Sequence, residues 1–151
     1  MRRRTVFGLA AGLVATLAAS AGALAYGAHS GGRQAIMRRM VSAAIDQALD
    51  EAHVTSEQRA TIYAARDRVF STVDAARTGH RAHLEETLRL FEADRPDPAE
   101  IEALHRQGEA ARQRIRDTVH EAIVEAHSVL TPAQRKAVAG YVRAHRMSHW
   151  H

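Results

Sequence analysis

Hydrophobic residues recur at spacings of three and four along most of the chain beyond residue 33. This is the pattern of helices that bury one apolar face. Short segments with capping residues divide the pattern into four stretches, so the sequence predicts four helices and an all-α fold. The first runs from about residue 34 to 52, and its apolar positions are Ile36, Met40, Val41, Ala44, Ile45, Ala48 and Leu49.

The other three stretches follow the same spacing. The second carries Ile62, Val69, Phe70, Val73, Leu84, Leu88 and Phe91; the third carries Ile101, Leu104, Ala111, Ile115, Val119, Ile123, Val124 and Leu130; the fourth carries Val138, Tyr141, Val142 and Ala144. Gly79 interrupts the second stretch. Because glycine costs about 1 kcal/mol relative to alanine inside a helix, we expect that helix to bend or loosen there.

Two of the boundaries have the same chemistry. Thr55 is followed three residues later by Gln58, and Thr131 by Gln134. A threonine that accepts a free backbone N–H and a glutamine that reaches back to the N-cap form a capping box. The repetition of this motif across about 75 residues is the most specific signal in the chain.

The remaining boundary is the segment 95–100. Pro96 ends the preceding helix, Asp97 caps the next one and Pro98 occupies its first position. Glu100 stands three residues after the cap, so we expect it to complete a capping box.

Composition supports an elongated helical protein in one domain. Aromatic residues make up 5% of the chain and only three prolines occur, which suits helices with a thin core. Cysteine is absent, which excludes disulfides and thiolate metal sites. The formal charge is +4, but Arg2, Arg3 and Arg4 supply three of these charges, so the rest is nearly balanced and a nucleic-acid partner is not expected.

Residues 1–25 have the features of an export signal: a basic start, an apolar stretch from Val6 to Leu24 and a small-residue cleavage motif before Tyr26. The alternative is an uncleaved inner-membrane anchor, since Thr5 to Ala28 is long enough to span a bilayer. Both place the remainder outside the cytoplasm, in the periplasm of a Gram-negative cell. Residues 26–33 are expected to form a flexible linker, 34–147 the helical domain and 148–151 a His-rich tail.

The paired motif resembles the L-T-x-x-Q signature of the Spy/CpxP family of periplasmic stress proteins. Leu130-Thr131-Pro132-Ala133-Gln134 matches it fully, whereas Val54 replaces leucine in the first copy. The acidic-proline turn at 94–100, followed by Ile101 and Leu104, resembles the related heavy-metal-resistance branch, which includes zinc-binding and nickel/cobalt-sensing proteins. The resemblance covers roughly residues 35–147.

The resemblance implies an elongated four-helix protomer that pairs antiparallel into a cradle-like homodimer. In the family the concave face binds unfolded or misfolded envelope proteins without ATP. The two motifs start helices rather than perform chemistry, a structural role that falls here on Val54, Thr55, Gln58, Leu130, Thr131 and Gln134.

Binding of unfolded clients requires exposed basic and apolar side chains. The candidates are Met37, Arg38, Arg39 and Met40 on the first helix, Arg66, Arg68, Phe70 and Arg77 on the second, and Arg112, Arg114 and Arg116 on the third. The alternative is that the apolar members belong to the core and the arginines to a solvated face.

The ten histidines suggest a second function. His145 and His149 share one helical face, and Met147 and His151 lie nearby. His80 and His83 form a second candidate pair. Imidazole ligands favour Zn, Ni or Cu over Mg or Ca. The alternative is that these are surface histidines at a chain end.

The sequence therefore predicts an ATP-independent periplasmic chaperone that requires no cofactor. One alternative is a heavy-metal-binding sensor or resistance protein, and another is an adaptor of an envelope-stress sensor kinase. No nucleophile elbow, P-loop or dinucleotide motif occurs, so we expect no enzymatic activity.

Overall fold

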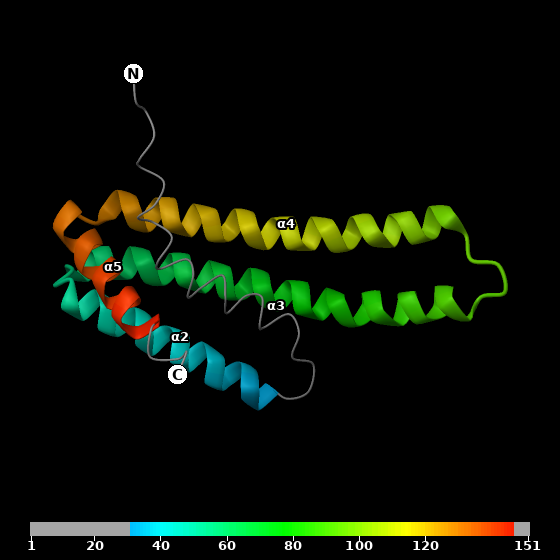
Figure 1. The fold of residues 1–151 in the computed structure, drawn as a ribbon, viewed down its shortest axis with the longest axis horizontal. Helices are drawn as coiled ribbons and strands as arrows, with labels where there is room; N and C mark the ends of the chain where they lie inside the picture. The colour runs from blue at the N-terminus through cyan, green and yellow to red at the C-terminus, as the bar shows by residue number, and fades with distance from the viewer. Residues whose placement is uncertain (1–30, 147–151) are drawn as a thin grey trace, which may run out of the picture.

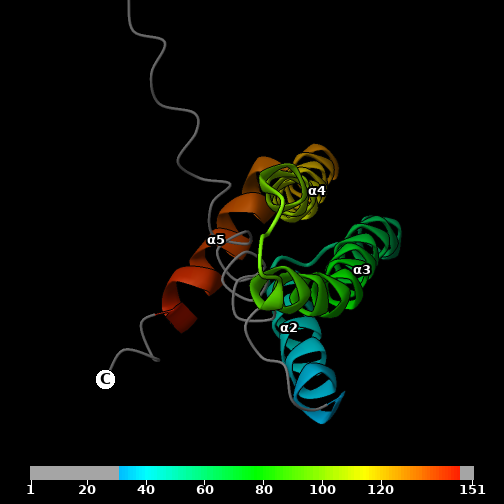
Figure 2. The ribbon, with the colours of Figure 1, turned by 90° about the vertical axis from the view of Figure 1, so that its right-hand side faces the viewer.

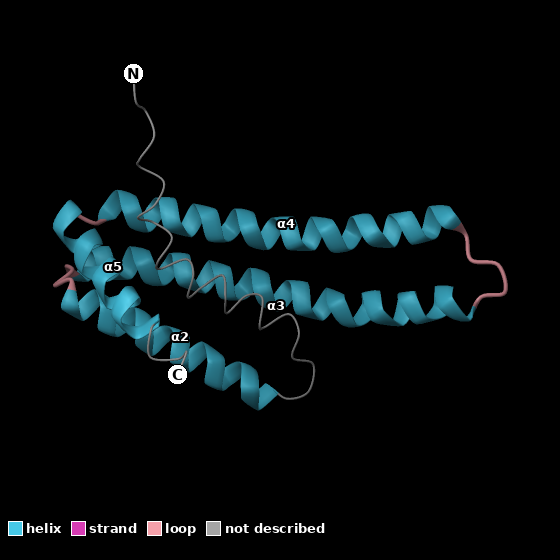
Figure 3. Ribbon diagram, viewed as in Figure 1, coloured by secondary structure: helices cyan, strands magenta, loops and turns pink. Residues whose placement is uncertain are grey.

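The computed structural model describes residues 31–146, with no strand among them. Its four helices are α2 (Gly31–Glu51), α3 (Ser56–Glu92), α4 (Pro98–Val129) and α5 (Pro132–Arg146) (Figure 1). Only short loops join them (Figure 3). The predicted all-α, four-helix fold is confirmed.

The two long helices, α3 and α4, form an antiparallel hairpin, and the two short helices pack at one end of it (Figure 1). Viewed along the hairpin, α2 lies beside α3, while α5 turns away from the end of α4 towards α2 (Figure 2). We call the four-helix end the body. The remainder of the hairpin, residues 74–118, is called the arm.

The helix boundaries agree with the predicted ones except at two places. Gly31 and Gly32 lie within α2, whose described residues are Gly31–Glu51, instead of preceding the helix as a linker. Asp97 caps α4 by accepting a hydrogen bond from the amide of Ala99 at 2.8 Å, but Glu100 does not complete a capping box. Its carboxylate instead binds the guanidinium of Arg89 across the hairpin at 2.7 Å.

The loop between α2 and α3 is shaped by a residue in the left-handed region. His53 has a φ of 49°, and its amide donates to the carbonyl of Asp50 at 3.0 Å. This conformation ends α2 and directs the chain into the N-cap of α3, since left-handed residues commonly terminate helices.

The hydrophobic core lies in the body, where all four helices contribute. Leu49 is fully buried at its centre, and burying a leucine contributes about 1.5–3 kcal/mol. The core contains Val41, Ile45, Ala48, Leu49, Ala52, Ile62, Ala65, Val69, Phe70, Val73, Val119, Ala122, Ala126, Leu130, Val138, Tyr141 and Val142.

Polar contacts reinforce the body. The Tyr63 hydroxyl donates to Asp46 at 2.5 Å and joins α3 to α2, and the Tyr141 hydroxyl donates to Gln47 at 2.5 Å and joins α5 to α2. Burial raises the pKa of the Tyr141 hydroxyl above its ordinary value of 10.0, with a smaller contribution from the charge of Glu51.

The arm has almost no core, contrary to the predicted apolar faces. Within it only Leu90 is buried, whereas Leu84, Leu88, Phe91 and Ile101 are exposed by 48%, 46%, 86% and 48%. Two helices cover only the seam between them, so an apolar residue beside the seam stays in water. Ile36 and Met40, near the start of α2, are exposed for the same reason, as is Val124 on the outer side of α4.

No helix within residues 31–146 is long and apolar enough to cross a membrane.

Candidate functional site

The two capping motifs meet at the end of the hairpin that lies in the body. The side-chain amides of Gln58 and Gln134 bond to each other twice: each Nε2 donates to the other residue's Oε1 at 3.0 Å. Each Oε1 also accepts the N-cap amide of its own motif, from Thr55 and Thr131 respectively, at 2.9 Å. We call this pair of amides the glutamine clamp.

The second hydrogen of each amide group reaches the loop of the opposite motif. Gln58 Nε2 donates to the carbonyl of Val129 at 2.7 Å, and Gln134 Nε2 lies 3.5 Å from the carbonyl of His53. The clamp therefore holds the α2–α3 loop against the α4–α5 loop. The preceding apolar residues anchor it, since Leu130 is buried and Val54 packs against the core.

The predicted client-binding residues divide into buried, engaged and accessible groups. Phe70 is buried in the core at 6% exposure, so its assignment to an exposed surface is wrong. Met37 is half-buried against the core. Arg38 stacks on Phe70, with its guanidinium 4.7 Å from the ring centre, and pairs with Asp74 at 3.2 Å.

Four of the other candidate arginines are also engaged by a neighbouring side chain: Arg66, Arg68, Arg112 and Arg116. Arg66 stacks on Tyr63 at 4.4 Å, and Arg68 pairs with Glu125. On α4, Arg112 pairs with Glu109 at 2.5 Å and Arg116 binds the amide of Gln113, while Arg114 is exposed and Arg77 on α3 is half-buried. Arg39 and Met40 are exposed. A shallow open groove of about 400 Å³ is lined by Arg38, Arg39, Ser42, Ala43, Asp46, Asp67 and Phe70.

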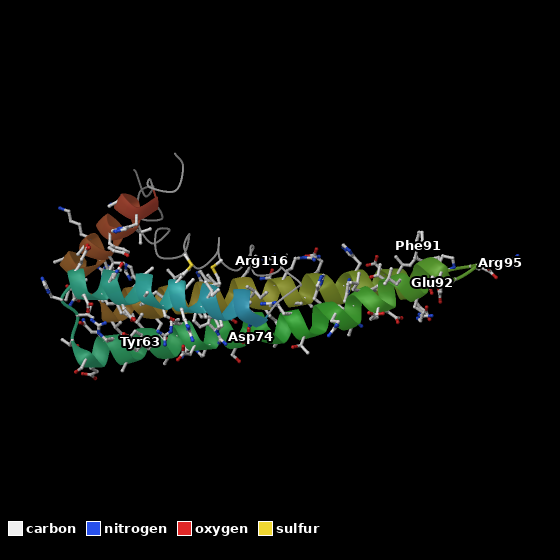
Figure 4. The ribbon with its side chains drawn as sticks, turned by 90° about the horizontal axis from the view of Figure 1, so that it is seen from below. Tyr63, Asp74, Phe91, Glu92, Arg95 and Arg116 are labelled. Atoms are coloured by element: carbon white, nitrogen blue, oxygen red, sulfur yellow. The ribbon has the colours of Figure 1, made fainter. Side chains whose placement is uncertain are left out.

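Several exposed apolar side chains lie on the arm, where the sequence predicted a buried apolar face. Leu84, Leu88 and Phe91 follow one another at i, i+4 and i+7, so they share one face of α3. Phe91 projects towards the side of the hairpin on which α5 lies (Figure 4). The ion pair between Arg89 and Glu100 joins α3 to α4 at this level. Ile101 follows Glu100, so it lies at the same level of the hairpin as these α3 residues. We call these four residues the arm face.

The arm is charged around this face. Arg89 binds Glu86 and Glu100, both at 2.7 Å. The hydrogen bond from Arg89 lowers the pKa of the Glu86 carboxyl below its ordinary value of 4.5, and Arg112 does the same for Glu109.

At the end of α5, the imidazole of His145 is held in a defined orientation. Its Nδ1 lies 2.9 Å from the carbonyl of Tyr141, and its ring stacks on the Tyr141 ring with a centroid separation of 4.0 Å. A carbonyl only accepts, so Nδ1 carries the proton in this contact, which is the tautomer with which a metal-binding histidine uses Nε2. Met147, His149 and His151, predicted to lie nearby, are outside the described residues.

The two histidines of the second predicted pair lie in different surroundings. His80 is exposed on α3, whereas His83 is half-buried and its Cε1 atom meets α4 at Gly108, 3.4 Å from where a Cβ would stand. Between residues 31 and 146, no three histidine, aspartate or glutamate side chains come together in a group able to hold a metal ion.

Together these features define an all-α protein in which a four-helix body, closed by paired capping motifs, carries a long two-helix arm. Residues 7–137 match the family described as heavy-metal resistance, and the chain belongs to this family. The family is part of the Spy/CpxP-like helical clan. No curated protein and no solved structure matches the chain.

Proposed function

We propose that the chain is an exported, periplasmic heavy-metal-binding protein that acts in metal resistance or sensing. Membership of the heavy-metal resistance family supports this function over the chaperone predicted first. The observation that carries it in the structure is the orientation of His145. An N–H to backbone-carbonyl bond on one imidazole nitrogen is the usual support for a metal on the other.

The ligand chemistry favours Zn, Ni or Cu. Imidazole is a borderline ligand that binds these ions better than it binds Mg or Ca. His149 and His151 follow His145 closely in the sequence, so we assign them as the further ligands, with Met147 as a softer one for copper. The chain itself then supplies the site from a single short segment.

The test is calorimetric titration of residues 26–151 with Zn²⁺, Ni²⁺ and Cu²⁺. We expect micromolar binding that weakens at least tenfold in His145→Ala and disappears when His145, His149 and His151 are all changed to alanine. His120→Ala, an exposed histidine on α4, is the matched control and should bind as the parent does. A parent chain that binds none of the three metals would refute the function; undiminished binding by the triple variant would refute the site alone.

A chaperone activity is the second candidate, and the arm face favours it. Exposed Leu84, Leu88 and Phe91 on a charged arm can hold a partly unfolded chain through weak apolar contact, without ATP. The test is light scattering of a denatured client diluted with the protein, in EDTA and in zinc. Leu88→Glu with Phe91→Glu should abolish suppression of aggregation, and unchanged suppression in that variant would exclude the arm face.

We also propose that the protein is a homodimer. The arm face and the exposed Ile36 and Met40 are apolar surfaces on separate parts of one molecule, since α2 reaches α3 only as far as the Arg38–Asp74 ion pair. A two-fold, antiparallel pairing would set the arm face of each molecule against Ile36 and Met40 of the other, and it is an alternative to client binding by the same face. Light scattering after size exclusion measures the molar mass and tests this proposal. The parent should have twice the mass of a Leu88→Glu, Phe91→Glu variant. A parent that is monomeric at about 100 µM would refute the homodimer.

A further inference from the structure

Two glycines, Gly79 and Gly108, occur at nearly the same level of the hairpin, in the half of the arm nearer the body. The contacts of Thr72 with Thr118 and of His83 with Gly108 set the register of the two helices. In this register Gly79 stands about one helical turn, or about 5 Å along the axis, from the level of Gly108. Each long helix therefore contains one glycine within the same short section.

Packing does not explain Gly79. A Cβ added there would meet no atom within 4 Å, so alanine would fit and would favour the helix. The residue before it, Thr78, donates through Oγ1 to the carbonyl of Asp74 at 3.1 Å, as Thr61, Thr72, Thr87 and Thr118 do to the carbonyls four residues before them. Such bonds bend helices slightly, and only at Thr78 does one stand next to a glycine.

This section of the hairpin, which lies wholly within the described residues, also lacks polar contacts between α3 and α4. Among the described residues, no hydrogen bond or ion pair joins α3 to α4 between the Thr72–Thr118 contact and the Arg89–Glu100 ion pair. The fully buried core ends at Val73 on α3 and at Val119 on α4, and half-buried Ile115 packs against it. Farther along the arm, the ring of His83 contacts α4 at Gly108.

We propose that the hairpin hinges at Gly79 and Gly108, so that the outer arm moves as a unit relative to the body. The motion changes the angle at which Leu84, Leu88 and Phe91 are presented, while the core and the glutamine clamp stay intact. One apolar surface can thus fit partners of different curvature. The hinge does not depend on metal binding. A bend of about 20° in an arm segment about 20 Å long moves the loop at its tip by about 7 Å.

The absence of cysteine allows a direct test by spin labelling. Asp94→Cys in the loop at the tip and Ala133→Cys at the start of α5 place two labels on exposed positions. Pulsed electron resonance then measures the distribution of distances between the arm and the body. Dilution with unlabelled chain removes distances between molecules, so the result holds for a monomer or a dimer.

We expect the distribution of distances between the two labels to be several ångströms broader in the parent than in the Gly79→Ala, Gly108→Ala variant. Gly79→Ala alone should narrow it as well, and it avoids the contact of a new Cβ with His83. Gly140→Ala is the matched control, because Gly140 is an exposed helical glycine in α5 with no atom within 4 Å of an added Cβ. It should stabilise its helix and leave the distribution broad. A distance distribution in the parent as narrow as that in the double variant would overturn the hinge. Equal narrowing of the distribution by Gly140→Ala would overturn it as well.

Discussion

Replacing one glutamine of the clamp tests how much the paired motifs contribute beyond ordinary helix capping. Gln58→Ala removes the two bonds shared with Gln134, the bond to the Val129 carbonyl and the cap of the Thr55 amide. At about 1 kcal/mol for each net hydrogen bond, and less for the exposed cap, the expected loss is about 2–4 kcal/mol in the free energy of unfolding. This is a large part of the ~5–15 kcal/mol that stabilises a typical domain.

Two further variants separate the contributions. Gln58→Glu keeps an acceptor for the Thr55 amide, since glutamate also serves in a capping box, but it cannot donate to Gln134 or to Val129. We expect it to be nearly as destabilising as the alanine variant. Gln113→Ala is the control, because the Gln113 side chain bonds only within α4 and should cost less than about 0.5 kcal/mol.

The assay is urea unfolding followed by far-UV circular dichroism, arranged as a double-mutant cycle with Gln134→Ala. Because the two glutamines bond to each other, the double variant should lose about 1–2 kcal/mol less than the sum of the single variants. Additivity within about 0.3 kcal/mol would refute the clamp and reduce both motifs to independent caps.

Other positions give simpler predictions. Leu49→Ala should cost about 2–5 kcal/mol in unfolding experiments, because Leu49 is fully buried in the core; a loss under about 1 kcal/mol would show that the core around Leu49 is not tightly packed. Tyr141→Phe should cost about 1 kcal/mol by removing the bond to Gln47, and an unchanged thermal midpoint would contradict that bond. The pKa of Glu86 is lowered by Arg89, so its contribution to stability is complete above pH 4.5 and is lost as the pH falls through the lowered pKa. In Arg89→Ala an NMR titration should show the Glu86 pKa returning upward, and no movement would exclude the ion pair.

The sequence was sufficient to predict the helices and the caps because both depend on local chemistry. Spacing of apolar residues and the residue pairs Thr55–Gln58 and Thr131–Gln134 act within one or two turns. Glu100 shows the limit of this reasoning. Its position suits a capping box, but a guanidinium on the other helix of the hairpin competes for the same carboxylate, and that partner is not visible in the local pattern.

Burial was the part that spacing could not predict. Phe70 and Phe91 occupy equivalent apolar positions of one helix, yet the first is in the core and the second is exposed. The difference lies in whether α2 and α5 reach that level of the hairpin, which depends on their lengths and packing. The contact between Gln58 and Gln134 could not be predicted for a similar reason. The local capping box already explains each glutamine, so nothing near either residue indicates a distant partner.

The clamp also has a consequence for the order of folding. The arm joins residues on either side of one short loop, so the hairpin can zip from its tip with little loss of chain entropy. The two glutamines are 76 positions apart and can meet only after both long helices have paired. Clamp variants should therefore leave the refolding rate nearly unchanged and accelerate unfolding. The lifetime of the native state, rather than the speed of reaching it, is then set by a pair of neutral amides.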